Sequence, residues 1–195
     1  MDAFPRVSIL MACWNRAAQL ERTLESIHRQ NYPNLEIVCI SDCRKRTRKW
    51  MNPAPLLNQA IRASTGEILI LQNPECMHIS EHLIENLVHP HKKQDHCVVF
   101  SSAMALDANC VEQQWYCHPT ARDCKWFFCG SIRRSVLLEA GGFAESFVEY
   151  GGEDIDFANK LTEMGVNFIW LPPEQALVHH QWHGYPEGMW ENGGA

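Results

Sequence analysis

The stretch Arg6–Asp42, RVSILMACWNRAAQLERTLESIHRQNYPNLEIVCISD, decides the fold of this chain. It opens with the short apolar run RVSILMAC, which is typical of a strand buried on both faces. Leu20, Leu24 and Ile27 then recur at the spacing of one face of a helix. Residues 36–41, EIVCIS, predict a second buried strand. A strand, a helix and a strand in this order predict two parallel strands joined by a right-handed crossover.

Polar residues follow both predicted strands. Cys13 to Arg16 lie at the end of the first strand, and Asp42 directly follows the second. Ligands of open α/β sheets bind at the carboxyl ends of the strands. We therefore expect a nucleoside pocket here, with Asp42 accepting hydrogen bonds from a base or a ribose. An ordinary turn residue is an equally good interpretation of Asp42.

A third strand, residues 67–71, runs into the sequence QNPE at residues 72–75. Glu75 is placed to help hold a divalent cation, because hard cations prefer oxygen ligands. A plain polar loop is the alternative. Near the end of the chain, a short strand at 176–178 is followed by three imidazoles within five positions, at His179, His180 and His183. One of them can reach a metal beside Glu75.

The segment Gly141–Gly165, GGFAESFVEYGGEDIDFANKLTEMG, carries the acids Glu153, Asp154 and Asp156 directly after a Gly-Gly pair. Acids in the first turn of a helix are favoured by the helix dipole, so we expect these to be ionised. An ionised carboxylate beside a glycine turn suits a general base. Simple capping of the helix is the alternative. We expect the apolar face of this helix to consist of Ile155, Ala158 and Leu161.

The composition fits one globular domain, at residues 1–183, followed by a flexible tail at 184–195. Of the 195 residues, 46% are hydrophobic and 21% are charged. A formal net charge of -6 argues against general binding of nucleic acid. No apolar run reaches the length of a membrane span, and the first residues lack the features of a signal peptide. With nine cysteines expected to be mainly free thiols, we predict a cytoplasmic protein.

The role of two further segments is less clear from their sequence patterns. The basic run Arg44–Lys49, RKRTRK, follows a strand end, where it can meet a diphosphate, although such a run is more often a solvated loop. Residues 107–123 contain no clear pattern, and we expect an irregular loop there. Trp115, Tyr116 and His118 are then expected to be exposed towards a site, since long loops in compact domains are often functional.

The motifs in the first half of the chain together resemble family 2 glycosyltransferases of the GT-A fold. The resemblance rests on VSILMACWNR, EIVCISD and LLNQAIRASTGEILIL. It implies an α/β fold with a mixed, mostly parallel sheet flanked by helices. It also implies that the strand ends hold a nucleotide, usually uridine. The residues that it assigns to donor binding are Ala12, Cys13, Asn15, Arg16, Asp42, Asn58, Gln72 and Asn73.

The segment GGFAESFVEYGGEDIDFANKL is similar to the Gly-Gly-Glu-Asp-x-Asp segment of inverting galactosyltransferases and their relatives. This similarity implies that Asp154 is the catalytic base and that Glu153 contacts the acceptor sugar. It also maps the metal-binding histidine of that family onto His180 or His183. The expected reaction is transfer from a UDP-sugar to a glycan or other hydroxyl acceptor, with inversion. The alternative is a non-catalytic module of the same fold that binds nucleotide sugars or carbohydrates.

One departure from the family pattern concerns the metal. The Asp-x-Asp that follows the third strand in the family is replaced here by residues 72–75, of which only Glu75 is acidic. The resemblance therefore implies that Mn²⁺ or Mg²⁺ is held by Glu75 with His180 and His183, and more weakly than by a full motif.

Overall fold

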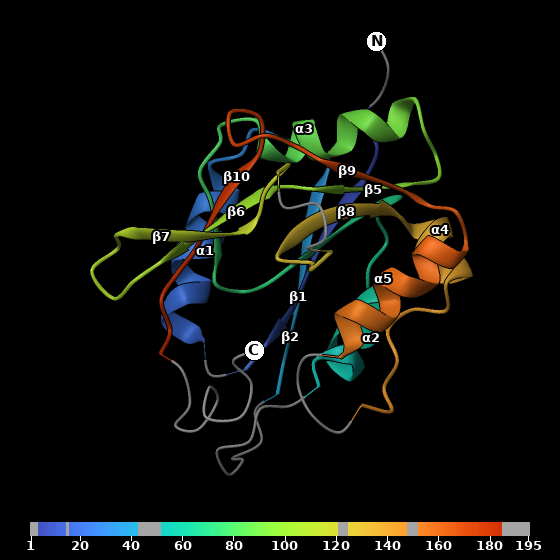
Figure 1. The fold of residues 1–195 in the computed structure, drawn as a ribbon, viewed down its shortest axis with the longest axis horizontal. Coiled ribbons are helices and arrows are strands. Elements are labelled where there is room, and N and C mark those ends of the chain that lie inside the picture. Colours follow the sequence, from blue (N-terminus) through green and yellow to red (C-terminus); the bar gives the residue numbers. More distant parts are fainter. Residues whose placement is uncertain (1–3, 15, 43–51, 121–124, 148–151, 185–195) are drawn as a thin grey trace.

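The computed structural model describes residues 4–14, 16–42, 52–120, 125–147 and 152–184. Its main sheet contains six strands (Figure 1). They are β1 (Val7–Cys13), β2 (Leu35–Ser41), β3 (Ile68–Gln72), β5 (Cys97–Phe100), β8 (Cys129–Arg133) and β9 (Asn167–Trp170). The order is β2-β1-β3-β8-β5-β9, and β8 runs antiparallel to both of its neighbours. The predicted mixed, mostly parallel sheet is confirmed.

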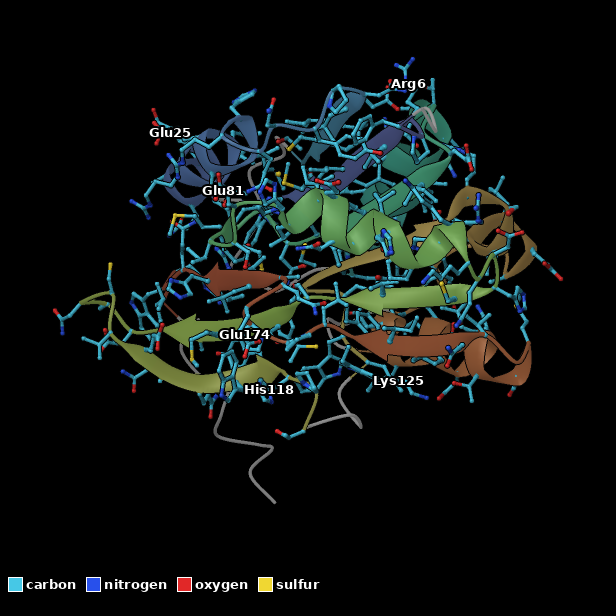
Figure 2. The ribbon with its side chains drawn as sticks, turned by 90° about the horizontal axis from the view of Figure 1, so that it is seen from above. Arg6, Glu25, Glu81, His118, Lys125 and Glu174 are labelled. Carbon is cyan, nitrogen blue, oxygen red and sulfur yellow. The ribbon has the colours of Figure 1, made fainter. Side chains whose placement is uncertain are left out.

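A second sheet lies beside the first. It consists of β4 (Cys76–His78), β6 (Ser102–Leu106), β7 (Glu112–Cys117) and β10 (Leu177–His180), in the order β4-β10-β6-β7. In the view from above, Arg6 before β1 and His118 after β7 lie on opposite sides of the molecule (Figure 2). The expectation of an irregular loop at 107–123 is wrong for residues 112–117, which pair with β6 through an irregular register. The sequence EQQWYC hides this edge strand because most of its side chains are exposed, so it shows no apolar alternation.

Helices cover the sheets. They are α1 (Ala17–His28), α2 (Ala54–Ala63), α3 (Leu83–Val88), α4 (Arg134–Glu139) and α5 (Glu153–Glu163), with a 3₁₀ turn, η1, at His89–Lys92. Helix α2 packs on β1 and β2, α1 packs on β4, and α3 packs on β5 and β8 (Figure 1).

Among the residues that the structure describes, no helix combines the length and the apolar character that a membrane span requires.

An aromatic cluster anchors α5 to the main sheet. Phe157 of α5 packs against Phe143 and Phe127, with ring centroids 4.4 and 5.4 Å apart, and Phe127 packs against Phe100 of β5 at 5.1 Å. The predicted apolar face of α5 is wrong in one member, because Ile155 is 50% exposed. At 100° per residue, positions 157, 158 and 161 lie within one arc of about 100°, whereas position 155 lies outside it, about 60° beyond position 158. The buried Phe157 therefore sets which face of α5 meets the core.

Candidate active site

A hollow opens at the carboxyl ends of β1, β2 and β3. These three strands are parallel, so their ends meet at one edge of the sheet. The Asp42 N–H donates to the Cys13 carbonyl at 3.1 Å and holds the first two strand ends together. The hollow encloses about 880 Å³, part of which is open to solvent. Its described walls consist of Ala12, Trp14, Arg16, Asp42, Asn52, Pro53, Leu56, Leu57, Leu71, Gln72, Asn73, Pro74, Glu75, Phe127, Phe143, Glu153 and Asp154.

Several predicted donor-binding residues lie in these walls. Ala12, Arg16 and Asp42 line the hollow, but Cys13 does not. The Cys13 side chain is buried, and its thiol is hydrogen-bonded to that of Cys39 on β2. Successive side chains of a strand point to opposite faces, which fits a Cys13 thiol that contacts Cys39 while Ala12 lines the hollow. Asn15 and the basic run at 44–49 lie outside the described residues.

The amides at the end of β3 have structural partners. Gln72 and Asn73 line the hollow. The Gln72 side chain is buried and donates to the Cys76 carbonyl at 2.7 Å, while its oxygen lies 2.8 Å from Nε2 of His78. Burial lowers the pKa of His78 to about 3, so this imidazole is neutral and donates to Gln72. Gln72 therefore shapes the loop that carries Glu75.

Asn58 is absent from the described walls of the hollow. Its side-chain nitrogen donates to the Phe143 carbonyl and to Glu145, both at 2.8 Å, and its oxygen accepts from the Phe143 N–H at 3.1 Å. Asn52 acts similarly, donating to the carbonyls of Ala144 and Phe147. These two asparagines thus tether the segment that leads towards α5.

The two acids at the start of α5 both line the hollow. Burial, together with the nearby charge of Glu153, raises the pKa of Asp154 to about 7, and the Phe127 N–H that it accepts only partly offsets this. The expectation that the helix N-terminus keeps these acids ionised is therefore wrong for Asp154, because loss of solvation outweighs the helix dipole. Glu153 is 2% exposed and accepts from the Gly152 N–H at 3.0 Å. A carboxylate with a pKa near 7 is well matched to proton abstraction at neutral pH.

Glu75 lines the hollow and meets His180 and His183, which are not among its described walls. Oε1 of Glu75 lies 3.3 Å from Nε2 of His180 and 3.6 Å from Nε2 of His183. One ligand atom from each residue lies within 4.8 Å of the others. Burial would raise the pKa of Glu75, but the hydrogen bond from His180 and the nearby Arg16 guanidinium help to hold it below its usual value. This donor set of one carboxylate and two imidazoles can hold a divalent metal ion.

The described walls of the hollow include neither His179 nor the aromatic side chains expected to face the site from residues 107–123. Nε2 of His179 lies 3.1 Å from a carboxylate oxygen of Glu112 of β7, and Trp115 packs on His118. Tyr116 packs against His180 at 5.1 Å, behind the metal-binding atoms. The described walls of the hollow do not include these aromatics.

Sequence reasoning missed several residues of the walls. Trp14 follows β1 directly, and its place at a strand end could have identified it. Phe127 contributes its ring to the wall and its N–H to Asp154. Its position in an aromatic run gave no signal, because aromatic residues are more often part of the core.

Comparison with known proteins agrees with this geometry. Residues 8–52 match the family model for glycosyl transferase family 2. No curated protein sequence matches the chain significantly. Similar solved structures include a mannosyltransferase, PcManGT from Pyrobaculum calidifontis, in complex with GDP-Man and Mn²⁺, at a TM-score of 0.68 and 19% identity. This match covers 96% of the present chain and 59% of the mannosyltransferase.

Two further structures show the same similarity. GalNAc-T7 with UDP, GalNAc and Mn²⁺ has a TM-score of 0.71 and 14% identity, over 94% of this chain and 45% of GalNAc-T7. S. aureus TarS in complex with UDP-GlcNAc has a TM-score of 0.69 and 13% identity, over 92% of this chain and 59% of TarS. The present chain thus spans about half of the length of these proteins. The similarity shows that it has the GT-A glycosyltransferase fold.

Proposed function

We propose that this chain transfers a sugar from a nucleotide diphosphate donor, a UDP-sugar, to an acceptor hydroxyl with inversion. The observation that carries the proposal is that Asp154, Asp42 and Glu75 line one hollow, although they come from three distant parts of the sequence. The family match at residues 8–52 and the GT-A fold support glycosyl transfer as the reaction class. Similar structures in complex with UDP and with UDP-GlcNAc support a uridine nucleotide, and Asp42 is the residue proposed to bind it.

In this mechanism, Asp154 is the general base. Its carboxylate takes the proton of the acceptor hydroxyl while the hydroxyl oxygen bonds to the anomeric carbon. The bond from that carbon to the diphosphate oxygen breaks on the opposite face, so the configuration inverts. The Phe127 N–H orients the Asp154 carboxylate, and Glu153 is placed to bind the acceptor. With a pKa of about 7 for Asp154, we expect the rate to rise through pH 7 and level off above it.

The charges around the hollow support a divalent cation. Its described walls contain four carboxylates, Asp42, Glu75, Glu153 and Asp154, and one guanidinium, Arg16. A nucleotide diphosphate would be repelled by this balance of charge. A bound Mn²⁺ or Mg²⁺ would supply the missing positive charge and stabilise the leaving diphosphate.

The metal ligands proposed here are Glu75, His180 and His183. Burial lowers the pKa of His183, which therefore stays neutral, as a metal ligand must be. Its Nδ1 lies 2.8 Å from the Gly184 carbonyl and donates to it, so the lone pair of Nε2 is directed towards Glu75. Oε2 of Glu75 is buried and accepts no hydrogen bond from any described residue. The Nε2 lone pair of His183 faces Oε1 of Glu75 at 3.6 Å, which fits a cation between them, and Nε of Arg16 lies 3.9 Å from Oε2.

The test replaces Asp154 by Asn. We expect turnover of UDP-sugar to fall by about 100-fold or more, with UDP binding changed only a few-fold. Asp156→Asn is a matched control, because Asp156 lies on the same helical turn, pairs with Lys160 at 2.8 Å and is absent from the described walls.

Turnover of Asp154→Asn near the parent rate would disprove the assignment of the base. A parent protein that binds UDP but neither transfers nor hydrolyses any UDP-sugar would favour the non-catalytic module instead.

A further inference from the structure

Gln181 connects the three proposed metal ligands to helix α1. It lies between His180 and His183 in sequence and is 4% exposed. Its backbone N–H donates to the Glu75 carbonyl at 3.0 Å, and its side-chain nitrogen lies 3.2 Å from the same oxygen. Gln181 thus contacts the backbone of Glu75 and is adjacent in sequence to His180.

The other contacts of Gln181 all go to α1. Its side-chain nitrogen donates to the Gln19 carbonyl at 3.0 Å and to Oγ1 of Thr23 at 3.1 Å. Its side-chain oxygen accepts from Nε of Arg22 at 2.5 Å. Gln19 in turn donates to the carbonyl of residue 182 at 3.0 Å. β10, which leads into this segment, pairs with β4, and β4 packs on α1.

We propose that Gln181 is a positioning residue that holds Glu75, His180 and His183 at metal-binding distance. This inference rests on the metal site of the proposed function. It goes beyond that function because Gln181 touches neither metal nor substrate in this role. It acts by fixing the loop of Glu75 and the segment 180–183 against one rigid helix.

The chemistry of the site explains why a glutamine is required. The Gln181 side chain is buried. Its nitrogen faces two acceptors, the Gln19 and Glu75 carbonyls, and its oxygen faces one donor, Nε of Arg22. An amide offers both a donor and an acceptor in one uncharged group. A carboxylate could accept from Arg22 but would face two carbonyl oxygens. An apolar side chain would remove the acceptor for Arg22 and the side-chain donor to the Gln19 carbonyl, while the Glu75 carbonyl would keep only the backbone N–H of residue 181.

Partners behind metal ligands set their orientation, and losing one typically lowers metal affinity by about 10- to 100-fold. We expect this range for Gln181→Met, which keeps the size of the side chain and removes its hydrogen bonds. The measurement is direct titration of the full chain with Mn²⁺, with free Mn²⁺ followed by electron paramagnetic resonance. A second variant, Gln181→Glu, keeps the acceptor for Arg22 and removes the donor, so it is expected to lose affinity as well.

Gln30→Met is the matched control. Gln30 follows α1, and its side chain donates to the Ser80 carbonyl at 2.9 Å, outside the described walls of the hollow. Its replacement removes a comparable partly buried hydrogen bond, so it can lower the melting temperature but should leave Mn²⁺ affinity within twofold of the parent. Saturating Mn²⁺ should restore the turnover of Gln181→Met, which a general folding defect would not allow.

The outcomes separate the two proposals. If the parent binds Mn²⁺ and both folded Gln181 variants bind it within twofold of the parent, the positioning role is wrong and the metal site stands. If Gln30→Met loses as much affinity as Gln181→Met, the effect is one of stability, and the positioning role is again wrong. If the parent itself binds no Mn²⁺, the metal site fails and the positioning role fails with it, while the assignment of Asp154 is tested separately by turnover.

Discussion

Asp154 illustrates how a single partly buried carboxyl group ties function to stability. Its pKa of about 7 arises mainly because burial disfavours the charged form, and Glu153 adds a second negative charge nearby. The same features that make Asp154 a suitable base at neutral pH also cost free energy whenever it is ionised in the folded protein. Functional sites often carry such a cost, which the rest of the fold must outweigh.

This cost predicts a pH-dependent effect of Asp154→Asn on stability. The folded state binds the proton more tightly than the unfolded state, whose carboxyl pKa is about 3.8. Protein with Asp154 therefore loses stability as the pH rises from about 4 to 7, and Asn does not share this loss. The melting temperature of the variant relative to the parent should rise over this range and stay constant above it. If the difference in melting temperature between Asp154→Asn and the parent is constant from pH 4 to pH 8, the pKa of Asp154 is not raised.

The residues around Asp154 also show where sequence reasoning stops at this scale. The Gly-Gly-Glu-Asp pattern pointed to the acids, and both line the hollow. The sign of the pKa shift at Asp154 could not be read from the pattern, because it depends on how deeply α5 is packed against Phe127 and Phe143. Phe127 lies 27 residues before Asp154, and the spacing of the acids does not show how closely α5 approaches either ring.

At the scale of elements, β1, β2 and β3 carry a structural clamp at the ends opposite the hollow. Glu36 of β2 accepts from Ser8 of β1 at 2.5 Å, and from the N–H groups of Thr65 and Gly66, before β3, at 2.5 and 3.2 Å. Arg6 adds an ion pair at 3.1 Å. A Cβ at position 66 would lie 2.3 Å from Oγ of Ser8, so glycine is needed for this close approach. The clamp fixes three strands in register and so aligns their carboxyl ends.

We predict that Glu36→Gln destabilises the protein by about 1–3 kcal/mol at pH 7, because it turns an amide towards donors that need an acceptor. Burial alone would raise the pKa of Glu36, but the hydrogen bonds from Ser8, Thr65 and Arg6 hold it at about 2. The stability that this carboxylate contributes is therefore present above its unfolded pKa of about 4.5 and is lost as the pH falls towards 2. In urea unfolding, the destabilisation caused by Glu36→Gln should be smaller at pH 3 than at pH 7. An equal loss at both values would refute this role of the carboxylate.

The elements themselves were largely predictable where their signals are local. The apolar runs of β1, β2 and β3 predicted those strands within one or two residues, and the helical spacing of Leu20, Leu24 and Ile27 predicted α1. The edge strand β7 was missed because its pairing with β6, not its composition, makes it a strand. Long-range tethers were equally invisible, as Asn58 shows, since its three hydrogen bonds go to Phe143 and Glu145, more than 80 residues away in the sequence.

At the scale of the whole molecule, the site is a meeting point of distant segments. The end of β1, the end of β3, the start of α5 and the segment after β10 together supply Arg16, Glu75, Asp154 and His183. A ligand that contacts all of these segments binds only the folded chain. Binding must therefore stabilise the protein as a whole. The net charge of -6 and the acidic walls make this stabilisation depend on a cation when the ligand is an anion.

UDP together with Mn²⁺ should therefore raise the melting temperature. At a free ligand concentration about 100-fold above Kd, the expected gain is about 2.7 kcal/mol. For a chain of this size that corresponds to roughly 5–11 °C. UDP in EDTA should give a much smaller shift, because the carboxylates of the hollow then face the diphosphate without a cation. In Glu75→Gln, the UDP-induced shift in melting temperature should be nearly the same in Mn²⁺ and in EDTA, since the substitution removes the negative ligand of the proposed metal site.

Thermal unfolding with each ligand alone and in combination separates the contributions. A shift with UDP that is the same in Mn²⁺ and in EDTA would show that Arg16 and other cationic groups hold the diphosphate without a metal. If the protein melts cooperatively and UDP shifts its melting temperature under neither condition, the proposal that the hollow binds a nucleotide is wrong. A shift that needs both ligands would mean that the two bind cooperatively, because the anion and the cation each reduce the electrostatic cost of bringing the other to the same acidic walls.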